Sequence, residues 1–154
     1  MKRREALAIL GGAGLIGPTL VSCKKRSTIM KKEIKTGKAP QAIGPYSQAI
    51  EANGLVFASG QIAIDPATGE LNKGIIEEQT RLVLTNLKAI MEAAGSSMAN
   101  VIKCTVFLQD LEDYAVMNSI YGDFFSSPYP ARAAVQVARL PKDVKVEIEA
   151  IAVK

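Results

Sequence analysis

Apolar side chains recur at the spacing of an α-helix over residues 75–94, and charged side chains occupy the opposite face. This 3.6-residue period predicts one long amphipathic helix that packs against a core. Gly95 follows directly and is suited to end the helix in a left-handed conformation. A second, shorter helix is predicted over residues 111–125, with Asp110 as its N-cap. The apolar positions of the two helices are Val83, Leu87, Ile90, Met91, Ala94, Met117, Ile120, Tyr121 and Phe124.

Most of the remaining chain follows the two-residue period of β-strands. Asn53-Gly54 separates residues 47–52 from residues 55–59, which predicts a two-residue hairpin because both turn residues tolerate a positive φ. Further strands are predicted over the ranges 31–35, 101–108, 131–138 and 144–153. In the range 101–108, the alternation places Ile102, Cys104, Val106 and Leu108 on one face. The order of elements predicts an α+β domain, in which two helices cover one face of a mixed, mostly antiparallel sheet.

The last predicted strand indicates what lies on the other face of the sheet. Its even-numbered positions, from Val144 to Ala152, are all apolar and suit the face that the helices cover. Its odd-numbered positions, from Lys145 to Val153, mix charged and apolar residues. A half-apolar sheet face of this kind is often covered by another subunit, so the pattern favours an oligomer.

The amino-acid composition excludes several kinds of catalytic and metal site. With 154 residues, 48% of them hydrophobic and 22% charged, the chain suits one packed domain rather than a disordered segment. The absence of histidine removes Ser–His and Cys–His nucleophile pairs and the usual imidazole metal sites. Two cysteines, Cys23 and Cys104, lie far apart and do not match the spacing of a zinc site, an iron–sulfur site or a disulfide framework.

The positive charge is confined to the start of the chain. Residues 1–35 hold nine Lys or Arg and two Asp or Glu, whereas residues 36–154 hold ten and thirteen, a net charge of −3. A mildly acidic domain does not attract a phosphate backbone. The chain also lacks tryptophan and has few aromatic residues on which bases could stack. We therefore expect no nucleic-acid partner.

The N-terminal segment is similar to an export signal. A basic start at residues 2–4, which includes an Arg-Arg pair, precedes an uncharged stretch over residues 6–21. That length is short for a membrane span but suits the apolar part of a signal peptide. The stretch ends in Leu-Val-Ser-Cys, which resembles a lipobox with Cys23 as the lipidated residue. We expect a signal peptide over 1–22, a basic linker over 23–35 and a lipoprotein of the cell envelope.

A second start site keeps another location open. Met30 begins the segment Met-Lys-Lys-Glu-Ile over residues 30–34, which is itself a plausible N-terminus, and a start at Met30 would remove the leader. The protein would then be cytoplasmic and would have no membrane anchor. The leader is excluded from the reasoning on the fold in either case.

Few residues offer chemistry outside the predicted core. Arg132 follows Pro130-Ala131 at the start of a strand and carries a bidentate fork that suits a carboxylate. Glu147 shares one face of the last strand with Glu149. Tyr46 follows Gly44-Pro45 in a loop, and Ser59-Gly60 ends a strand where a ligand could approach the backbone. Taken alone, these residues fit surface charges and packing as well as they fit a site.

Three segments carry a resemblance that brings these residues together. They are residues 38–48, residues 58–62 and the stretch 130–150, which contains the motifs Pro-Ala-Arg and Val-Glu-Ile. With these motifs, residues 30–154 closely resemble the Rid (YjgF) family of reactive-intermediate deaminases, and we assign the family domain to residues 36–154.

The resemblance implies a chorismate-mutase-like fold that assembles as a homotrimeric barrel, with active sites at the subunit interfaces. It also implies hydrolysis of short 2-imino acids and their enamines to 2-oxo acids and ammonia. The expected substrates are 2-aminoacrylate, 2-iminopropanoate and 2-iminobutanoate. No cofactor and no metal are expected.

Residue roles follow from the same resemblance. Arg132 would bind the substrate carboxylate, and Glu147 would position the attacking water and could share in proton transfer. Glu147 is preferred over Glu149 because it is the glutamate of the Val-Glu-Ile motif. The remaining expected substrate contacts are Tyr46, Ser59, Gly60, Asn118 and Phe124.

Two differences from members of the family, together with the predicted export signal, keep an alternative function open. Several relatives carry a cysteine two residues beyond the arginine, where this chain has Ala134, and the loop over 126–129 is shorter than in some relatives. An exported protein would also meet few of the imines that cytoplasmic enzymes release. The alternative is a non-catalytic trimeric module of the cell envelope that binds small carboxylates or a protein.

Overall fold

The computed structural model describes residues 30–154. Within this range the chain forms six strands, two α-helices and three short 3-10 helices. The strands are β1 (Lys32–Ile34), β2 (Ala49–Ala52), β3 (Leu55–Gln61), β4 (Val101–Leu108), β5 (Ala131–Gln136) and β6 (Val146–Val153). The α-helices are α1 (Ile76–Ala93) and α2 (Tyr114–Phe124), and the 3-10 helices are Met98–Asn100, Leu111–Asp113 and Pro141–Asp143.

The predicted signal peptide over 1–22 and the predicted lipidation site Cys23 lie outside the described residues, as does most of the basic linker over 23–35. Within residues 30–154, no helix is both long enough and apolar enough to cross a membrane.

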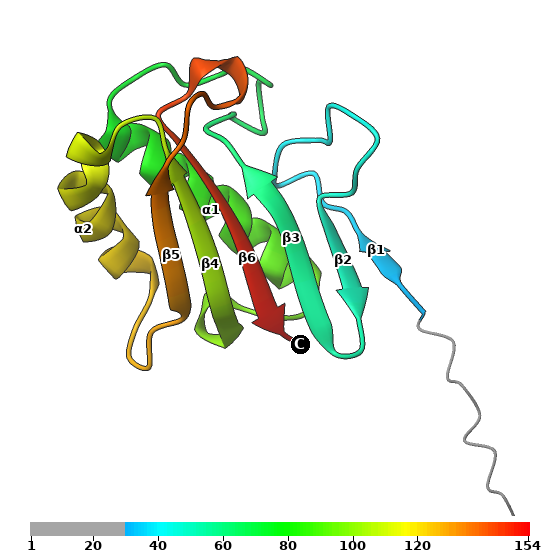
Figure 1. The fold of residues 1–154 in the computed structure, drawn as a ribbon. Coiled ribbons are helices and arrows are strands. Elements are labelled where there is room, and N and C mark those ends of the chain that lie inside the picture. The colour runs from blue at the N-terminus through cyan, green and yellow to red at the C-terminus, as the bar shows by residue number, and fades with distance from the viewer. Residues whose placement is uncertain (1–29) are drawn as a thin grey trace, which may run out of the picture.

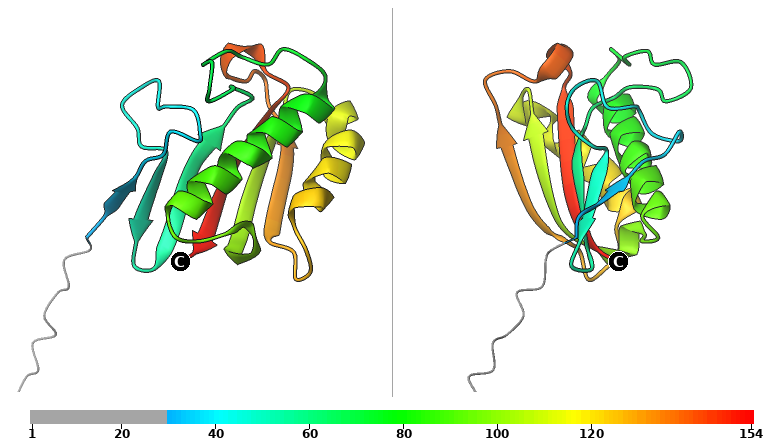
Figure 2. Two further views of the ribbon diagram at one scale, coloured as in Figure 1. Left: turned by 180° about the vertical axis from the view of Figure 1, so that it is seen from behind. Right: turned by 90° about the vertical axis from the view of Figure 1, so that its right-hand side faces the viewer.

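All six strands join one sheet in the order β1-β2-β3-β6-β4-β5. Only the β4–β5 pair is parallel, because α2 returns the chain to the same end of the sheet, and the other neighbours are antiparallel. Both helices lie against one face of the sheet (Figure 1). The edge-on view in Figure 2 shows that no described element covers the opposite face. The predicted α+β class, with its mixed and mostly antiparallel sheet, is confirmed.

Local signals in the sequence account for the hairpin and the long helix. Asn53 and Gly54 both take positive φ angles, of 52° and 77°, and join β2 to β3 in a two-residue turn. Helix α1 ends as expected, since Gly95 has a φ of 77°. The Ser96 amide then donates to the Met91 carbonyl at 2.9 Å, which satisfies a carbonyl at the end of the helix.

Strand β6 divides the domain into a packed face and an open face. Val146, Ile148, Ala150 and Ala152 are buried beneath the helices, as the alternation predicts. The residues between them are half-buried or exposed on the other face. Large apolar side chains on that open face remain partly exposed in the single chain, and they are Phe57, Val135 and Val153.

The structure corrects several predicted boundaries. In β4, the pairing with β6 shifts register between Val101 and Lys103, so Val101 is buried and Ile102 is 46% exposed. Ile102 therefore does not share the buried face of Cys104, because a bulge breaks the two-residue alternation. Asp110 caps the 3-10 turn Leu111–Asp113, and the α-helix proper begins only at Tyr114. Strand β5 ends at Gln136 instead of residue 138, and β6 begins at Val146.

Candidate functional site

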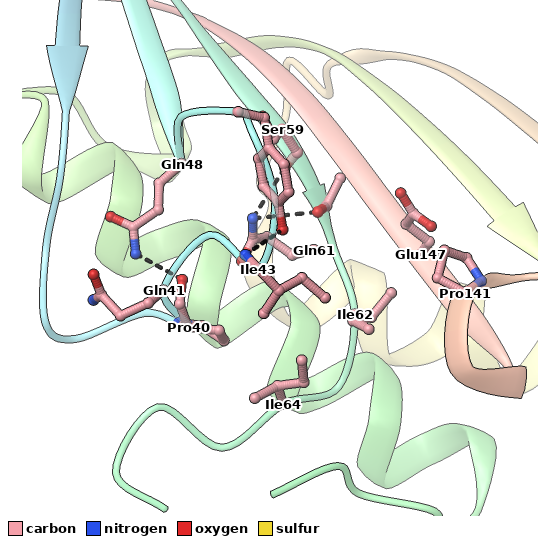
Figure 3. A pocket seen from close by; sticks show the side chains of 12 residues that line it. Pro40, Gln41, Ile43, Gln48, Ser59, Gln61, Ile62, Ile64, Pro141 and Glu147 are labelled. Carbon is pink, nitrogen blue, oxygen red and sulfur yellow. Dashed lines mark hydrogen bonds between the residues drawn. The ribbon is translucent and has the colours of Figure 1, made fainter. Parts of the chain in front are cut away.

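Glu147 lies in a pocket of about 340 Å³ between the β1–β2 loop, the end of β3 and the start of β6. In Figure 3 its carboxyl group and Pro141 face the end of β3 across the pocket. Most of the lining is apolar or amide in character, and Glu147 supplies the only ionisable carboxyl group among the residues that line it. The lining residues are Pro40, Gln41, Ile43, Tyr46, Gln48, Ser59, Gly60, Gln61, Ile62, Ile64, Pro141 and Glu147.

A bulge in β3 makes room for the carboxyl group. Ala58 pairs with Ala150 and Gln61 pairs with Ile148, so β3 contains one more residue than β6 over this stretch. Bulges of this kind often occur next to functional sites, where they redirect side chains. The extra residue lies in Ser59-Gly60, and a Cβ atom at Gly60 would overlap Oε1 of Glu147. Glycine is thus required here for the close approach of the carboxyl group to the β3 backbone.

The surroundings of Glu147 favour its protonated form. Burial, and after it the negative charge of Glu149, raises the pKa of the Glu147 carboxyl above its ordinary value. No ion pair with a lysine or arginine holds it ionised among residues 30–154. A carboxyl group whose pKa is raised returns a proton more readily after accepting one, which suits an acid–base role.

The β1–β2 loop supplies the wall of the pocket that faces Glu147. The Tyr46 hydroxyl accepts a hydrogen bond from the Ile43 amide at 3.3 Å, and the Tyr46 amide donates to the Gly44 carbonyl at 2.8 Å. The side chains of Ile43 and Tyr46 remain substantially exposed in the single chain. Tyr46 thus lines the pocket, as the sequence predicts, with its hydroxyl turned back towards its own loop.

Ser59 contributes to the pocket mainly by fastening that loop. Its hydroxyl donates to the Ser47 carbonyl at 2.7 Å, and its amide donates to the Gln48 carbonyl at 3.0 Å. The hydroxyl hydrogen is therefore used within the protein. What Ser59 and Gly60 present to the pocket is chiefly the backbone of the bulge.

Arg132 occupies a second pocket, of about 380 Å³, on the edge strand β5. Its Nη2 atom donates to the Asn118 Oδ1 atom at 2.7 Å and to the Tyr114 hydroxyl at 2.9 Å. The Tyr121 ring lies beneath the guanidinium group, with the Cζ atom 4.5 Å from the ring centroid. All three partners are on α2. The pocket is lined by Asn118, Tyr121, Gly122, Tyr129, Pro130 and Arg132.

The partners of Arg132 leave its charge available. Asn118 and Tyr114 are neutral, and burial raises the pKa of the Tyr121 hydroxyl, so this ring also stays neutral. Among the described residues, Arg132 forms no salt bridge with a carboxylate. The guanidinium group is therefore oriented by α2 but keeps its capacity to bind an anion.

The two pockets do not meet within one chain. Arg132 contacts α2 and so lies on the helix side of the sheet, whereas Glu147 alternates with the buried Val146 and Ile148 and lies on the open side. Strand β4 also separates β5 from β6. The structure brings Tyr46, Ser59 and Gly60 to Glu147, and it brings Asn118 to Arg132. Phe124 packs against the core and lines neither pocket, so its expected substrate contact stays a prediction.

Some residues of the two pockets escaped the sequence reasoning. The sequence places Tyr121 among the apolar positions of the second helix and gives Tyr114 no role in a site, yet both contact the Arg132 guanidinium group. Their spacing of four and three residues around Asn118 places all three on one helix face, which is the signal that could have found them. Gln48 and Ile43 carry no such signal, because their positions depend on the path of a loop.

The described residues offer no obvious site for a metal. Nowhere in residues 30–154 do three or more His, Cys, Asp or Glu side chains gather closely enough to hold an ion. The donor groups around Glu147 are backbone carbonyls, amides and hydroxyls, with the one carboxyl group.

The fold and the two pockets define a small α+β domain with a desolvated carboxyl group on one face of its sheet and an unpaired arginine on the other. Residues 36–154 match the family model described as Endoribonuclease L-PSP. The chain therefore belongs to this family, also known by the name YjgF.

Relatives with curated names cover nearly the whole domain. The chain is 59% identical to a RutC family protein of Pyrococcus horikoshii over 81% of this chain and 99% of the relative. It is 49% identical to the 2-iminobutanoate/2-iminopropanoate deaminase of Bos taurus, over 83% of this chain and 93% of the relative.

Solved structures show the same fold. The crystal structure of Escherichia coli TdcF with bound serine matches with a TM-score of 0.76 and 52% identity, over 80% of this chain and 98% of that one. The YjgF gene product of Escherichia coli matches with a TM-score of 0.75 and 48% identity, over 80% of this chain and 98% of that one.

Proposed function

We propose that this protein hydrolyses short 2-imino acids and their enamine tautomers to 2-oxo acids and ammonia, without a cofactor. The observation that carries the proposal is the Glu147 carboxyl group, whose pKa is raised by burial in a pocket otherwise free of ionisable carboxyl groups. The name of the bovine relative, a 2-iminobutanoate/2-iminopropanoate deaminase, supports the same chemistry. The expected substrates are 2-aminoacrylate, 2-iminopropanoate and 2-iminobutanoate.

The reaction needs one proton-transferring group and one anion-binding group. An enamine first takes a proton at C3 and becomes the imine. Glu147 then accepts a proton from water while the water oxygen bonds to C2 of the protonated imine, and the C2=N π electrons become the lone pair of an amine on a tetrahedral carbon. The carboxyl group returns its proton to this nitrogen, the C2–N bond breaks and ammonia leaves, while the C2 hydroxyl gives its proton to the Glu147 carboxylate and becomes the carbonyl. The substrate is already electrophilic, so positioning and partial exclusion of water supply much of the acceleration.

The anion-binding group is Arg132, and its placement supports an oligomeric site. Arg132 stands on an edge strand and on the face of the sheet opposite Glu147, so one chain cannot direct both groups at one small substrate. A neighbouring copy that covers the open face could bring its own Arg132 to the Glu147 pocket. We propose a homotrimer in which each active site combines Glu147 of one subunit with Arg132 of the next.

Mixing two inactive variants tests this arrangement. Arg132→Ala and Glu147→Gln subunits are each expected to lose turnover of 2-iminobutanoate, generated in the assay from an amino acid. Unfolding and refolding equal amounts of the two together would produce a random population of trimers, in which about a quarter of all sites receive both native residues. Recovery of about a quarter of the activity supports a site shared between subunits. No recovery in mixed trimers would mean that each chain works alone.

Measurements on the wild-type protein alone also distinguish the proposed deaminase from the competing functions. Wild-type protein that binds 2-oxobutanoate without turning over the imine would be the non-catalytic binding module. RNA cleavage at low salt by the same preparation would favour the activity in the family's description. The net charge of −3 over residues 36–154 gives RNA little electrostatic attraction, so we expect no cleavage.

We also propose that the protein is a lipoprotein of the cell envelope, attached through Cys23, on the signal-like order of charges and apolar residues before that cysteine. Intact mass after separation of membrane and soluble fractions tests this. A membrane-bound chain that begins at Cys23 with added acyl mass is expected. A soluble chain that begins at Met30 would instead make the protein cytoplasmic.

A further inference from the structure

The loop between β1 and β2 contributes five residues to the Glu147 pocket, and the buried amide of one of them, Gln48, holds the others in place. The loop residues in the pocket lining are Pro40, Gln41, Ile43, Tyr46 and Gln48. None of them belongs to a helix or strand. Their positions therefore depend on whatever fastens the loop, and the side chain that does so is Gln48, which is only 3% exposed.

Gln48 bonds to the loop backbone through both ends of its amide. The Nε2 atom donates towards three carbonyl oxygens, those of Pro40 at 2.7 Å, Thr36 at 3.0 Å and Ala39 at 3.1 Å. The Oε1 atom accepts a hydrogen bond from the Thr36 amide at 2.7 Å. Figure 3 shows the Gln48 side chain bonded to Pro40 in the wall of the pocket. One buried side chain thus ties Gln48 to Thr36, twelve positions earlier in the chain, and closes the loop between them.

The loop is also attached by Ala39, which is 1% exposed and packs into the core, and by the Ser47 hydroxyl, which donates to the Glu33 carboxylate of β1 at 3.1 Å. Ser59 holds the far side through the Ser47 carbonyl, and the bonds within the loop, such as that from the Ile43 amide to the Tyr46 hydroxyl, are local and exposed. A buried hydrogen bond to a backbone carbonyl is costly to leave unmade. Loss of the Gln48 amide would therefore release Pro40 and the segment that follows it, including Ile43 and Tyr46.

We propose that Gln48 is a positioning residue for the reaction, which acts by holding Ile43 and Tyr46 as the wall of the substrate pocket. The inference rests on the proposed deaminase function. Only an amide suits the position, because a carboxylate of the same shape would have no hydrogen to donate and would oppose three carbonyl oxygens. Glu147 stands on β6 and does not move with the loop. The effect of Gln48 therefore falls on substrate binding rather than on the chemical step.

The test compares Gln48→Leu and Gln48→Glu with the wild type on 2-iminobutanoate, with kcat and KM measured separately. We expect KM to rise about tenfold in both variants while kcat stays within about threefold, because Glu147 keeps its place. A partly unfolded preparation would give the opposite result, a lower kcat at unchanged KM. That result, or unchanged values of both constants, would overturn the proposal.

A matched control is available in Gln79. This glutamine is also buried, and it also bonds to backbone at both ends, to the Gly74 carbonyl at 3.0 Å and the Lys145 amide at 2.9 Å, but it lines no part of the Glu147 pocket. Gln79→Leu is expected to lower thermal stability without raising KM. A tenfold rise in KM in this variant as well would assign the effect to general loosening and contradict the role of Gln48.

A second readout does not depend on turnover. Hydrogen exchange of the amides in residues 36–46 is expected to speed up in Gln48→Leu, while exchange in α1 and β6 stays unchanged. Unchanged exchange in the loop would overturn the inference even in an active enzyme. If the wild type fails to hydrolyse the imine but the loop exchange responds as expected, the proposed function fails and the fastening role of Gln48 stands.

Discussion

The two pockets contain groups of opposite charge, and the surroundings of the two groups differ. Glu147 lies in an apolar pocket beside a second carboxylate, so its pKa is raised and its negative charge is disfavoured. Arg132 lies over an aromatic ring among neutral hydrogen-bond acceptors on an exposed edge of the sheet. Contact between the two groups within one chain would form a salt bridge and lower the pKa of Glu147. Their separation on two faces prevents this ion pair within one chain, and in the proposed trimer the substrate carboxylate would be the partner of Arg132.

The largest expected effect comes from removing the two charges in turn. Glu147→Gln is expected to lower kcat by about 10² to 10⁴, the range for loss of a general acid–base group, with KM little changed. Arg132→Ala is expected to raise KM as well, and to lower kcat/KM by about 100-fold, because it removes a charge-assisted contact to the substrate carboxylate. Steady-state kinetics on 2-iminobutanoate measures both.

Arg81→Ala serves as the control for these variants, since it removes an exposed arginine that pairs with Asp123 at 3.2 Å. Its kinetic constants should match the wild type. The same loss of kcat and the same KM in Glu147→Gln and Arg132→Ala would contradict the division of roles between the pockets.

A smaller effect is expected at the bulge. In Gly60→Ala the new Cβ atom would overlap the Glu147 carboxyl group, which must shift away from the β3 backbone. We expect about a tenfold loss in kcat/KM, below the roughly 10²-fold that a misplacement of about an ångström can cost at a reacting group. Gly37→Ala is the matched control, because a Cβ atom at Gly37 would meet no atom within 4 Å. Equal kinetics in the two variants would show that the close approach at Gly60 is not needed.

The smallest expected effect is a shift in the pH dependence of kcat/KM. The negative charge of Glu149 contributes to the raised pKa of Glu147, so Glu149→Gln should lower that pKa. The ionised form of Glu147 accepts the proton from water, and the acidic limb of the kcat/KM profile should therefore move to lower pH, with little change in the maximal rate. If the acidic limb of the profile stays in place or moves to higher pH, it reports the titration of a group other than Glu147.

The parts of the fold that the sequence predicts are those decided by local chemistry. The helical period around Leu87, the turn at Asn53-Gly54 and the alternation of β6 all appear in the structure. The two bulges, at Val101 and at Ser59-Gly60, could not be predicted, because a bulge depends on the register of the partner strand.

The sequence selects several residues that line the two pockets but not the arrangement of those residues. The resemblance of the motifs to a known family selects Arg132 and Glu147 and implies a shared site between subunits. It does not say that Arg132 rests on Tyr121 and bonds to Tyr114, or that Gln48 closes the loop beneath the pocket. These contacts join segments far apart in the chain, and only the packed domain brings them together.

The position of Arg132 on an edge strand has a consequence for how the enzyme behaves on dilution. If each active site takes one group from each of two subunits, a dissociated chain has no complete site. Specific activity then falls with protein concentration below the dissociation constant of the assembly, by mass action and without any change in the fold of the subunit. The number of working sites is set by how many subunits are assembled as well as by how many are made.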